Sequence, residues 1–299
     1  MKKSLLLSIG FVLLTVPQIT FAWGNAGHEC VTEIALQHNP SLSNKVVAIL
    51  KKLPSSKDWK ALSKTKISGF HPVDKGDPAG WVKALRYNPA KSATFPDWAR
   101  DYTGYKPADY DKWHYYDLDF ADADSGKYVL HPNALEKLPP LENDLRTKTG
   151  GARAWALVWV LHIVGDLHQP LHCCSRAIQG SNDGDHGGNS VTYKSTELHS
   201  WWDHLPDQMT KNNPGEYAAK LLVQFNALDA TQRQAIESKA SDLNIDHWIH
   251  EGRDAIVQIK YPADHPATFS YSTEARKIVD QQLLLGGLRL EKVLEASLP

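Results

Sequence analysis

Along most of this chain, apolar residues recur at three- and four-residue spacing, which is the spacing of one face of an α-helix. Strand-like alternation is scarce, and its best example is Ser190–Tyr193, directly after the turn-forming run Asp183–Gly188. The pattern therefore predicts a mainly α-helical fold with at most a small β-hairpin. The predicted helices are Val31–Gln37, Leu42–Leu53, Gly151–Leu167, Leu198–Leu205, Pro214–Phe225, Thr231–Ser238, Ile245–Tyr261 and Ser272–Ala296.

Two stretches lack the helical pattern and are rich in Gly, Pro, Asp and aromatic residues. They are Ser63–Pro96 and Tyr102–Pro140, and we expect both to be long surface loops. Long loops on a rigid scaffold commonly carry binding and catalytic residues. The chain shows no linker, internal repeat or low-complexity run, so residues 23–299 are predicted to form a single domain.

The first 22 residues have the pattern of a secretory signal peptide. Lys2 and Lys3 precede the apolar run Leu5–Val16, and Thr20-Phe21-Ala22 offers small residues at the two positions that signal peptidase reads. A membrane anchor is the competing interpretation, but the apolar run is shorter than the roughly 20 residues that span a bilayer. We therefore expect an exported protein, periplasmic or secreted, whose first residue is Trp23.

Charge and cysteine content limit the classes of function. The net charge is −1 for the whole chain, and removal of Lys2 and Lys3 makes it −3, which argues against long-range electrostatic attraction to a nucleic-acid duplex. Three cysteines, Cys30, Cys173 and Cys174, match neither a zinc ribbon nor a haem-attachment motif. In an oxidising compartment Cys30 can pair with either of the other two, and the sequence does not choose between them.

The segment His162–His172 carries the strongest chemical signal. His162 and Asp166 are four residues apart at the end of a predicted buried helix, so they face the same way, and Trp155 and Trp159 extend the same stripe. His199 and Asp203 repeat this spacing. Imidazole and carboxylate ligands without thiolate suit zinc, so two such pairs with His172 predict a multinuclear zinc site.

A simpler interpretation exists for any one of these pairs. A single His/Asp pair at helical spacing is more often a surface hydrogen bond or a charge pair at a helix end. The occurrence of two pairs in an exported chain favours the metal site. A free α-amine at Trp23, close in sequence to His28, adds two further candidate ligands.

Eight short motifs follow one another along nearly the whole mature chain. They are Trp23–His28, Phe95–Arg100, His114–Asp117, His162–His172, Gly187–Asn189, Leu198–Asp203, Trp248–Glu251 and Gly286–Leu290. Each motif is weak alone, whereas their order and spacing are specific. In this order and spacing the chain resembles the type I nucleases, which are zinc-dependent single-strand nucleases and 3′-nucleotidases of the mung bean nuclease type, related to bacterial zinc phospholipase C.

The resemblance implies three zinc ions. It places one on Asp97, His114, His162 and Asp166. It places a second on the amine and carbonyl of Trp23 and on His28, with Asp166 as a bridge, and a third on His172, His199 and Asp203. Two metals about 3.5 to 4 Å apart can share and deprotonate a water, while a third neutralises phosphate charge.

The implied reaction is in-line attack on phosphorus that releases the 3′ oxygen. Single-stranded DNA and RNA then yield 5′-phosphorylated products, and 3′-nucleotides lose phosphate. Arg100 is implied to bind the phosphate and stabilise its developing charge, and Asp117 to orient the attacking hydroxide. The simpler interpretations are a surface ion pair with Asp101 for Arg100 and a loop-capping carboxylate for Asp117.

Two further residues are candidates for substrate binding. A recessed metal cluster is reached only by a base that has left its stack, and Tyr115, directly after His114, is the candidate platform for that base. Core packing is the alternative for Tyr115. Asn189, after two glycines, is either an ordinary turn residue or, by the family pattern, lies near bound phosphate or base.

Two other functions stay open from the sequence alone. Zinc phospholipase C shares the metal cluster and the N-terminal Trp, but the Gly187–Asn189 element and Asp203, where the lipase typically has Glu, favour the nuclease. A secreted zinc-binding protein without catalysis needs the ligands but neither Arg100 nor Asp117.

Unlike fungal and plant relatives, the chain has few cysteines and no usable N-glycosylation acceptor. We expect a monomer without stable membrane association.

Overall fold

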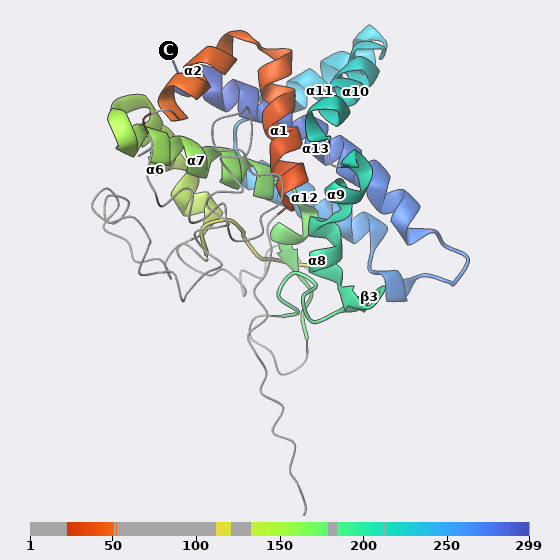
Figure 1. Cartoon of the computed structure of the whole chain (residues 1–299). Helices are drawn as coiled ribbons and strands as arrows, with labels where there is room; N and C mark the ends of the chain where they lie inside the picture. Colours follow the sequence, from red (N-terminus) through yellow and green to blue (C-terminus); the bar gives the residue numbers. More distant parts are fainter. Residues whose placement is uncertain are drawn as a thin grey trace, which may run out of the picture.

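The computed structural model describes residues 23–50, 52, 112–120, 133–178, 184–211 and 213–298, apart from the side chain of Asn25. In these residues the chain is mainly α-helical, as the sequence predicts (Figure 1). The α-helices are α1 Asn25–His38, α2 Ser41–Leu50, α6 Ala134–Thr147, α7 Gly150–Asp166, α8 Leu198–Asp203, α9 Leu205–Thr210, α10 Pro214–Asn226, α11 Ala230–Ser241, α12 Ile245–Ile259 and α13 Tyr271–Ser297.

The remaining regular elements are short. Two 3₁₀-helices are η3 Pro170–His172 and η4 Pro262–Asp264. The strands are β1 Leu118–Asp119, β2 Cys174–Ser175, β3 Thr192–Tyr193 and β4 Thr196–Glu197. β1 pairs with β2 in parallel, and β3 pairs with β4 as an antiparallel hairpin, which confirms the small hairpin expected near residue 190.

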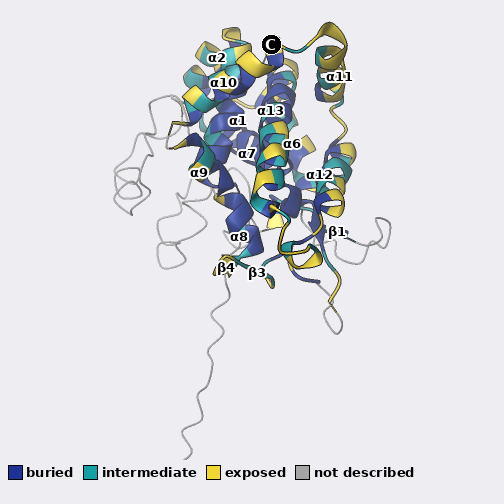
Figure 2. Cartoon of the chain, turned by 90° about the vertical axis from the view of Figure 1, so that its right-hand side faces the viewer, coloured by how far each residue is buried: buried dark blue, intermediate teal, exposed yellow. Residues whose placement is uncertain are grey.

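Helix α7 is the centre of the fold. Every residue from Ala154 to Asp166 is buried, so the helix is apolar on all sides, as expected for a helix enclosed by others. α6 packs along it, and α1, α2 and α13 contact it as well. Figure 2 shows α7 in the colour of buried residues, whereas α11 and α12 present exposed residues on their outer sides.

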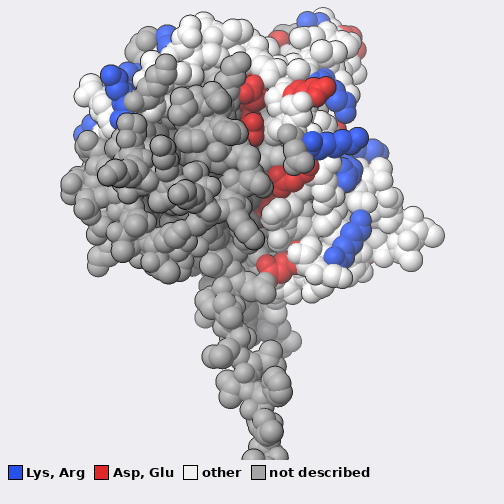
Figure 3. Space-filling model, in the orientation of Figure 1, with Lys and Arg blue, Asp and Glu red and all other residues white. Residues whose placement is uncertain are grey.

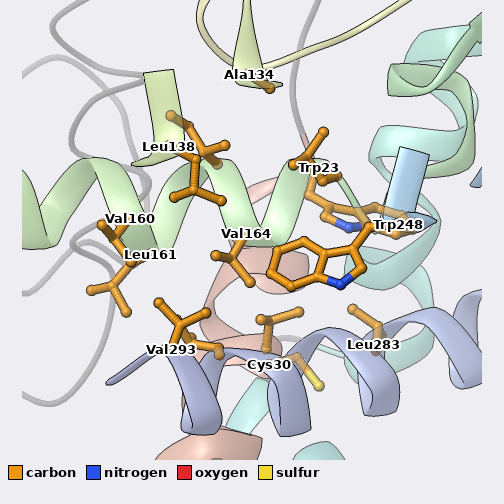
Figure 4. Packing of buried hydrophobic residues seen from close by; sticks show 14 of the residues in the cluster. Trp23, Cys30, Ala134, Leu138, Val160, Leu161, Val164, Trp248, Leu283 and Val293 are labelled. Carbon is orange, nitrogen blue, oxygen red and sulfur yellow. The ribbon is translucent and has the colours of Figure 1, made fainter. Parts of the chain in front are cut away.

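The long helix α13 crosses the molecule and contacts α1, α10, α11 and α7. Figure 4 shows side chains of α1, α7 and α13 meeting, among them Cys30, Val164 and Leu283. Gly287 permits the close approach of α13 to α1, because a Cβ at this position would lie 2.3 Å from the Ile34 side chain. These contacts bring the N-terminal and C-terminal thirds of the chain against the same face of α7.

One prediction about a connecting region is wrong. The stretch Tyr102–Pro140 was expected to be a surface loop throughout, but α6 begins at Ala134 and includes Pro139 and Pro140. The prolines remove two backbone donors, a cost that the apolar face of α6 offsets by packing on α7. The buried residues of that face are Ala134, Leu138, Leu141 and Leu145. The stretch Ser63–Pro96 lies outside the described residues.

Two smaller differences concern the predicted helix Leu198–Leu205 and the cysteines. The helix ends at Asp203, and a separate helix α9 starts at Leu205. Cys30, Cys173 and Cys174 are buried free thiols, and burial is the main cause that raises the pKa of each. Neither disulfide that the sequence allowed is present in the structure.

Candidate metal centre

The C-terminal end of α7 places His162 and Asp166 one helical turn apart. Nε2 of His162 lies 3.0 Å from Oδ2 of Asp166, and both side chains are fully buried. α7 ends at Asp166, and Gln169 then caps the 3₁₀-helix η3 by accepting a hydrogen bond from the Leu171 amide. Because η3 follows within four residues, His172 is directed to the same end of α7.

Helix α1 brings a third side chain to this carboxylate. Nε2 of His28 lies 3.1 Å from Oδ1 of Asp166, and the rings of His28 and His162 are stacked with centroids 4.7 Å apart. The backbone nitrogen of Trp23 lies 3.2 Å from the same Oδ1. Gly165 makes this approach of α1 possible, since a Cβ there would lie 2.5 Å from Nδ1 of His28. Two imidazoles and a carboxylate thus meet in one buried group.

A second buried group is formed by His172, His199 and Asp203. Nε2 of His172 lies 3.7 Å from Oδ1 of Asp203, and Nε2 of His199 lies 3.7 Å from Oδ2. His199 and Asp203 stand one turn apart on α8, as their spacing predicts. Gln169 donates a hydrogen bond of 2.8 Å to Oδ1 of Asp203, which fixes the carboxylate.

His114 lies beside both groups. Its fully buried ring has its centroid 5.1 Å from that of His172 and 6.0 Å from that of His162. The Tyr116 amide donates to the His172 carbonyl at 2.8 Å, and the β1–β2 pairing follows, so the backbone holds the two segments in register. Residues from four separate parts of the chain therefore converge at one end of α7.

The two groups fit bound metal ions by their chemistry and geometry. In each group, two imidazole nitrogens and one carboxylate oxygen lie within 4.8 Å of one another. Ligand atoms about 2.0 to 2.1 Å from one tetrahedral zinc lie roughly 3.3 Å apart, close to the 3.0, 3.1 and 3.7 Å measured here. All six side chains are buried, where ionic groups persist only when paired or ligated.

The carboxylate of Asp166 is held in its charged form. Burial alone would raise its pKa, but the neighbouring His162, His28 and His172 lower the pKa well below the usual range of an aspartate. Its Oδ1 faces His28 and Trp23, while Oδ2 faces His162. With its two oxygens directed to different neighbours, Asp166 would be able to hold two metal ions, one beside His28 and one beside His162.

The other sequence-predicted residues differ in how the structure places them. Tyr115 is partly buried, and its ring meets the His114 ring edge to face at 5.1 Å. Asp117 is buried and directly precedes β1 in the chain. Asn189 donates its side-chain amide to the His186 carbonyl, which is the contact of a turn residue. Asp97 and Arg100 lie outside the described residues.

Sequence reasoning missed the residues that hold the candidate ligands in place. Nδ1 of His199 donates to the Gly187 carbonyl at 2.7 Å, which leaves Nε2 facing Asp203. Gly187 has a φ of +64°, and a Cβ there would lie 2.4 Å from the Leu171 carbonyl oxygen. Gln169 and Gly187 lie within two motifs found in the sequence, His162–His172 and Gly187–Asn189. The spacing of residues in these motifs does not predict which side chains the two residues contact.

The fold and these groups define a helical protein with buried histidine and aspartate clusters suited to metal ions. A family model described as S1/P1 nuclease matches residues 23–299, so the chain belongs to the S1/P1 nuclease family. It is 26% identical over 212 residues to Nuclease S1 of Aspergillus oryzae, covering 68% of this chain and 61% of that protein.

A second relative is Endonuclease 3 of Arabidopsis thaliana, which is 26% identical over 205 residues, covering 65% of this chain and 58% of the relative. The matched regions thus span about three fifths of the length of each relative. Family membership confirms the resemblance found in the sequence.

Proposed function

We propose that this chain is an exported, zinc-dependent nuclease. It hydrolyses single-stranded DNA and RNA to 5′-phosphorylated products and removes phosphate from 3′-nucleotides. The observation that carries the proposal is the convergence of two buried groups, each of two histidines and one aspartate, at the end of α7 in a chain of the S1/P1 nuclease family.

Three zinc ions are proposed on the residues that the sequence singled out. His28, Asp166 and the Trp23 nitrogen would hold one, and His172, His199 and Asp203 would hold another. His162 and His114 would hold the third, with the other oxygen of Asp166 and with Asp97. Bound zinc supplies Lewis-acid activation of water and neutralises charge on the phosphate.

The chain's own residues have separate tasks in this reaction. Asp166, ionised and buried, carries the negative charge that gathers cations at the end of α7. Gln169 and the Gly187 carbonyl orient Asp203 and His199 through hydrogen bonds. Asp117, three residues after His114, is proposed to orient the attacking water, and Arg100 to bind the phosphate through its paired donors.

Selection of single strands is proposed to rest on Tyr115. Its ring meets the buried His114 ring edge to face, and the residue is partly exposed. A base that has left its stack can rest on such a ring. The described part of the face in Figure 3 shows acidic and basic side chains interspersed without a continuous basic field, which favours local recognition over long-range attraction.

Export is proposed from the leader pattern of residues 1–22 and from the start of the family match at Trp23. Among the described residues, none of the helices is both long and apolar enough to cross a membrane. From the leader pattern, we propose that the working enzyme begins at Trp23 and acts in the periplasm or outside the cell.

The test is one preparation that begins at Trp23, measured for zinc by elemental analysis and for hydrolysis with and without a chelator. The substrates are single-stranded DNA, RNA, duplex DNA, 3′-AMP and phosphatidylcholine. About three zinc ions with chelator-sensitive, single-strand hydrolysis leaving 5′-phosphate ends is expected. Three zinc ions with hydrolysis of phosphatidylcholine alone would assign a phospholipase C. Zinc without hydrolysis of any substrate would assign a binding protein, and one zinc or none would overturn the ligand assignment.

A further inference from the structure

Asp185 is a buried carboxylate outside the two histidine and aspartate groups. It is 1% exposed and accepts three hydrogen bonds. Its Oδ2 accepts from the Tyr261 hydroxyl at 2.7 Å, and its Oδ1 accepts from the Arg176 amide at 2.8 Å and from the Ser175 hydroxyl at 3.2 Å. A carboxylate buried in this way needs such donors, because burial without them is costly.

Asp185 lies within a turn whose backbone is largely left-handed. Gly184, His186, Gly187 and Gly188 all have positive φ, with values of 59°, 55°, 64° and 84°. The non-glycine residue His186 is strained at its angle. Such a run persists only where surrounding contacts determine it. The contacts of Asp185 with β2 and with Tyr261 are of that kind.

This turn is continuous with the metal group on α8. Ser175, which donates to Asp185, also accepts from the Gly187 amide at 3.4 Å. The Gly187 carbonyl then accepts from Nδ1 of His199 at 2.7 Å, and the Gly188 carbonyl from the His199 amide at 3.4 Å. A path of hydrogen bonds therefore runs from Tyr261 through Asp185, Ser175 and Gly187 to His199.

The path determines which nitrogen of His199 is available to a metal. With the Nδ1 proton donated to Gly187, Nε2 carries the lone pair and faces Asp203. A histidine ligand typically donates its second nitrogen to a fixed acceptor, and removal of that partner weakens metal binding about 10- to 100-fold. The acceptor here is a glycine carbonyl, whose position depends on the strained turn.

We propose that Asp185 is a positioning residue for the group of His172, His199 and Asp203, acting on His199 through Ser175 and the turn Gly184–Gly188. The inference rests on the proposed zinc centre. Asp185 touches neither substrate nor metal in this role. It keeps the Gly187 carbonyl in contact with Nδ1 of His199. Loss of Asp185 should therefore lower the affinity for the metal ion at His172, His199 and Asp203, while the group around Asp166 keeps its metal.

The experiment compares Asp185→Ala with wild type by zinc titration against a competing chelator. We expect one ion to bind about 10- to 100-fold more weakly while the remaining ions keep their affinity. Zinc anomalous scattering from crystals of both proteins then identifies the weakened position, which should be the His172, His199 and Asp203 group. Asp185→Asn keeps an acceptor oxygen for Arg176 and Ser175. Its affinity for the ion at the His172, His199 and Asp203 group should therefore lie between those of wild type and Asp185→Ala.

The chain supplies a matched control in the pair of Tyr217 and Asp280. The Tyr217 hydroxyl donates to Asp280 at 2.7 Å, the same contact as in the pair of Tyr261 and Asp185, but between α10 and α13. Asp280→Ala should keep all zinc affinities. Should Asp185→Ala fail to fold, Tyr261→Phe removes only one donor and should still show a selective weakening of the same ion.

The outcomes separate this inference from the proposed function. Suppose that wild type binds zinc at both groups, and that Asp185→Ala and Tyr261→Phe bind every ion as tightly as wild type does. The positioning role is then overturned, and the zinc centre stands. Equal weakening of all ions would also overturn it, because that result indicates a general loss of structure. If wild type binds no zinc, the metal centre itself is overturned and Asp185 loses its proposed role with it.

Discussion

The backbone nitrogen of Trp23 lies 3.2 Å from Oδ1 of Asp166, although 143 residues separate them in the chain. Nε2 of His28 lies 3.1 Å from the same oxygen. In a peptide bond this nitrogen can only donate, because its lone pair is delocalised into the carbonyl. As a free α-amine it would have a lone pair to offer a metal at this position.

A chain that begins at Trp23 should therefore bind one zinc ion more than a chain that retains Ala22. We expect about three ions in the first and about two in the second, with lower hydrolysis of single-stranded DNA in the second. Elemental analysis after dialysis measures the difference. One alanine added after Pro299 is the control for chain length. Equal zinc content and turnover in the two proteins would show that the amine is not a ligand.

Replacement of Asp166 by Asn should abolish hydrolysis and remove bound zinc. Asp166 faces both His28 and His162. The loss of zinc affinity should therefore exceed the roughly 10- to 100-fold loss that is typical of a residue that only supports a ligand. Asp246→Asn is the matched control, because Asp246 and His250 form the same four-residue pair on α12 but are partly exposed. Activity and zinc content close to wild type in Asp166→Asn would contradict the bridging role.

Gln169→Leu should lower the affinity for a single zinc ion by about 10- to 100-fold. The Gln169 amide donates to Asp203 at 2.8 Å, and its carbonyl oxygen accepts from the Leu171 amide at 2.6 Å, so it links η3 to a proposed metal ligand. Leu preserves the bulk and removes both hydrogen bonds. Chelator competition measures the affinity, and the midpoint of thermal unfolding of the zinc-free proteins shows separately how much stability the two bonds supply. Unchanged zinc affinity would limit Gln169 to a structural role.

The sequence predicted the elements whose signal is local. The period of apolar residues gave α7, α10, α12 and α13 to within two residues at each end, and the four-residue spacing gave the pairs of His162 with Asp166 and His199 with Asp203. Helix α6 was missed because Pro139 and Pro140 indicate a loop, while the packing of Leu138 and Leu141 on α7 that offsets them is a tertiary effect.

The candidate site shows the same division between local and distant contacts. Periodicity and spacing could not bring His28 to Asp166, since that contact depends on the packing of α1 against α7 at Gly165. The resemblance to the nuclease family supplied that link instead. The roles of Gln169 and Gly187 were not predicted, because a buried amide or a left-handed glycine gains meaning only once its partner across the fold is known.

Arg289→Met should destabilise the fold without altering the zinc ligands. The buried Arg289 donates to Nε2 of His168 at 3.1 Å and pairs with Glu251 at 2.9 Å, so its removal leaves both partners unsatisfied. We expect a loss of about 2 to 4 kcal/mol in the free energy of unfolding, measured by urea denaturation of zinc-free protein. Lys277→Ala, which breaks an exposed pair with Glu274 on the same helix, should cost about 1 kcal/mol or less. Similar losses in the two variants would contradict the importance of the buried network.

Glu29 should make the zinc-free protein less stable as the pH rises. Burial, with a smaller contribution from the charge of Glu33, raises the pKa of Glu29 from 4.5 to about 7. Between these values the folded state holds a proton that the unfolded chain has already released. The free energy of unfolding therefore falls as the pH rises from about 4.5 to about 7 and stays lower above that range.

Glu29→Gln removes this dependence, because the amide has no proton to lose. The variant should be more stable than wild type at about pH 8, and the difference should vanish near pH 4, where both states of wild type are protonated. Urea denaturation in the presence of a chelator measures both values without interference from zinc binding, which has its own pH dependence. Glu33→Gln removes only the smaller cause and should give part of the effect. A constant difference between Glu29→Gln and wild type across this range would show that Glu29 titrates alike in the folded and unfolded states.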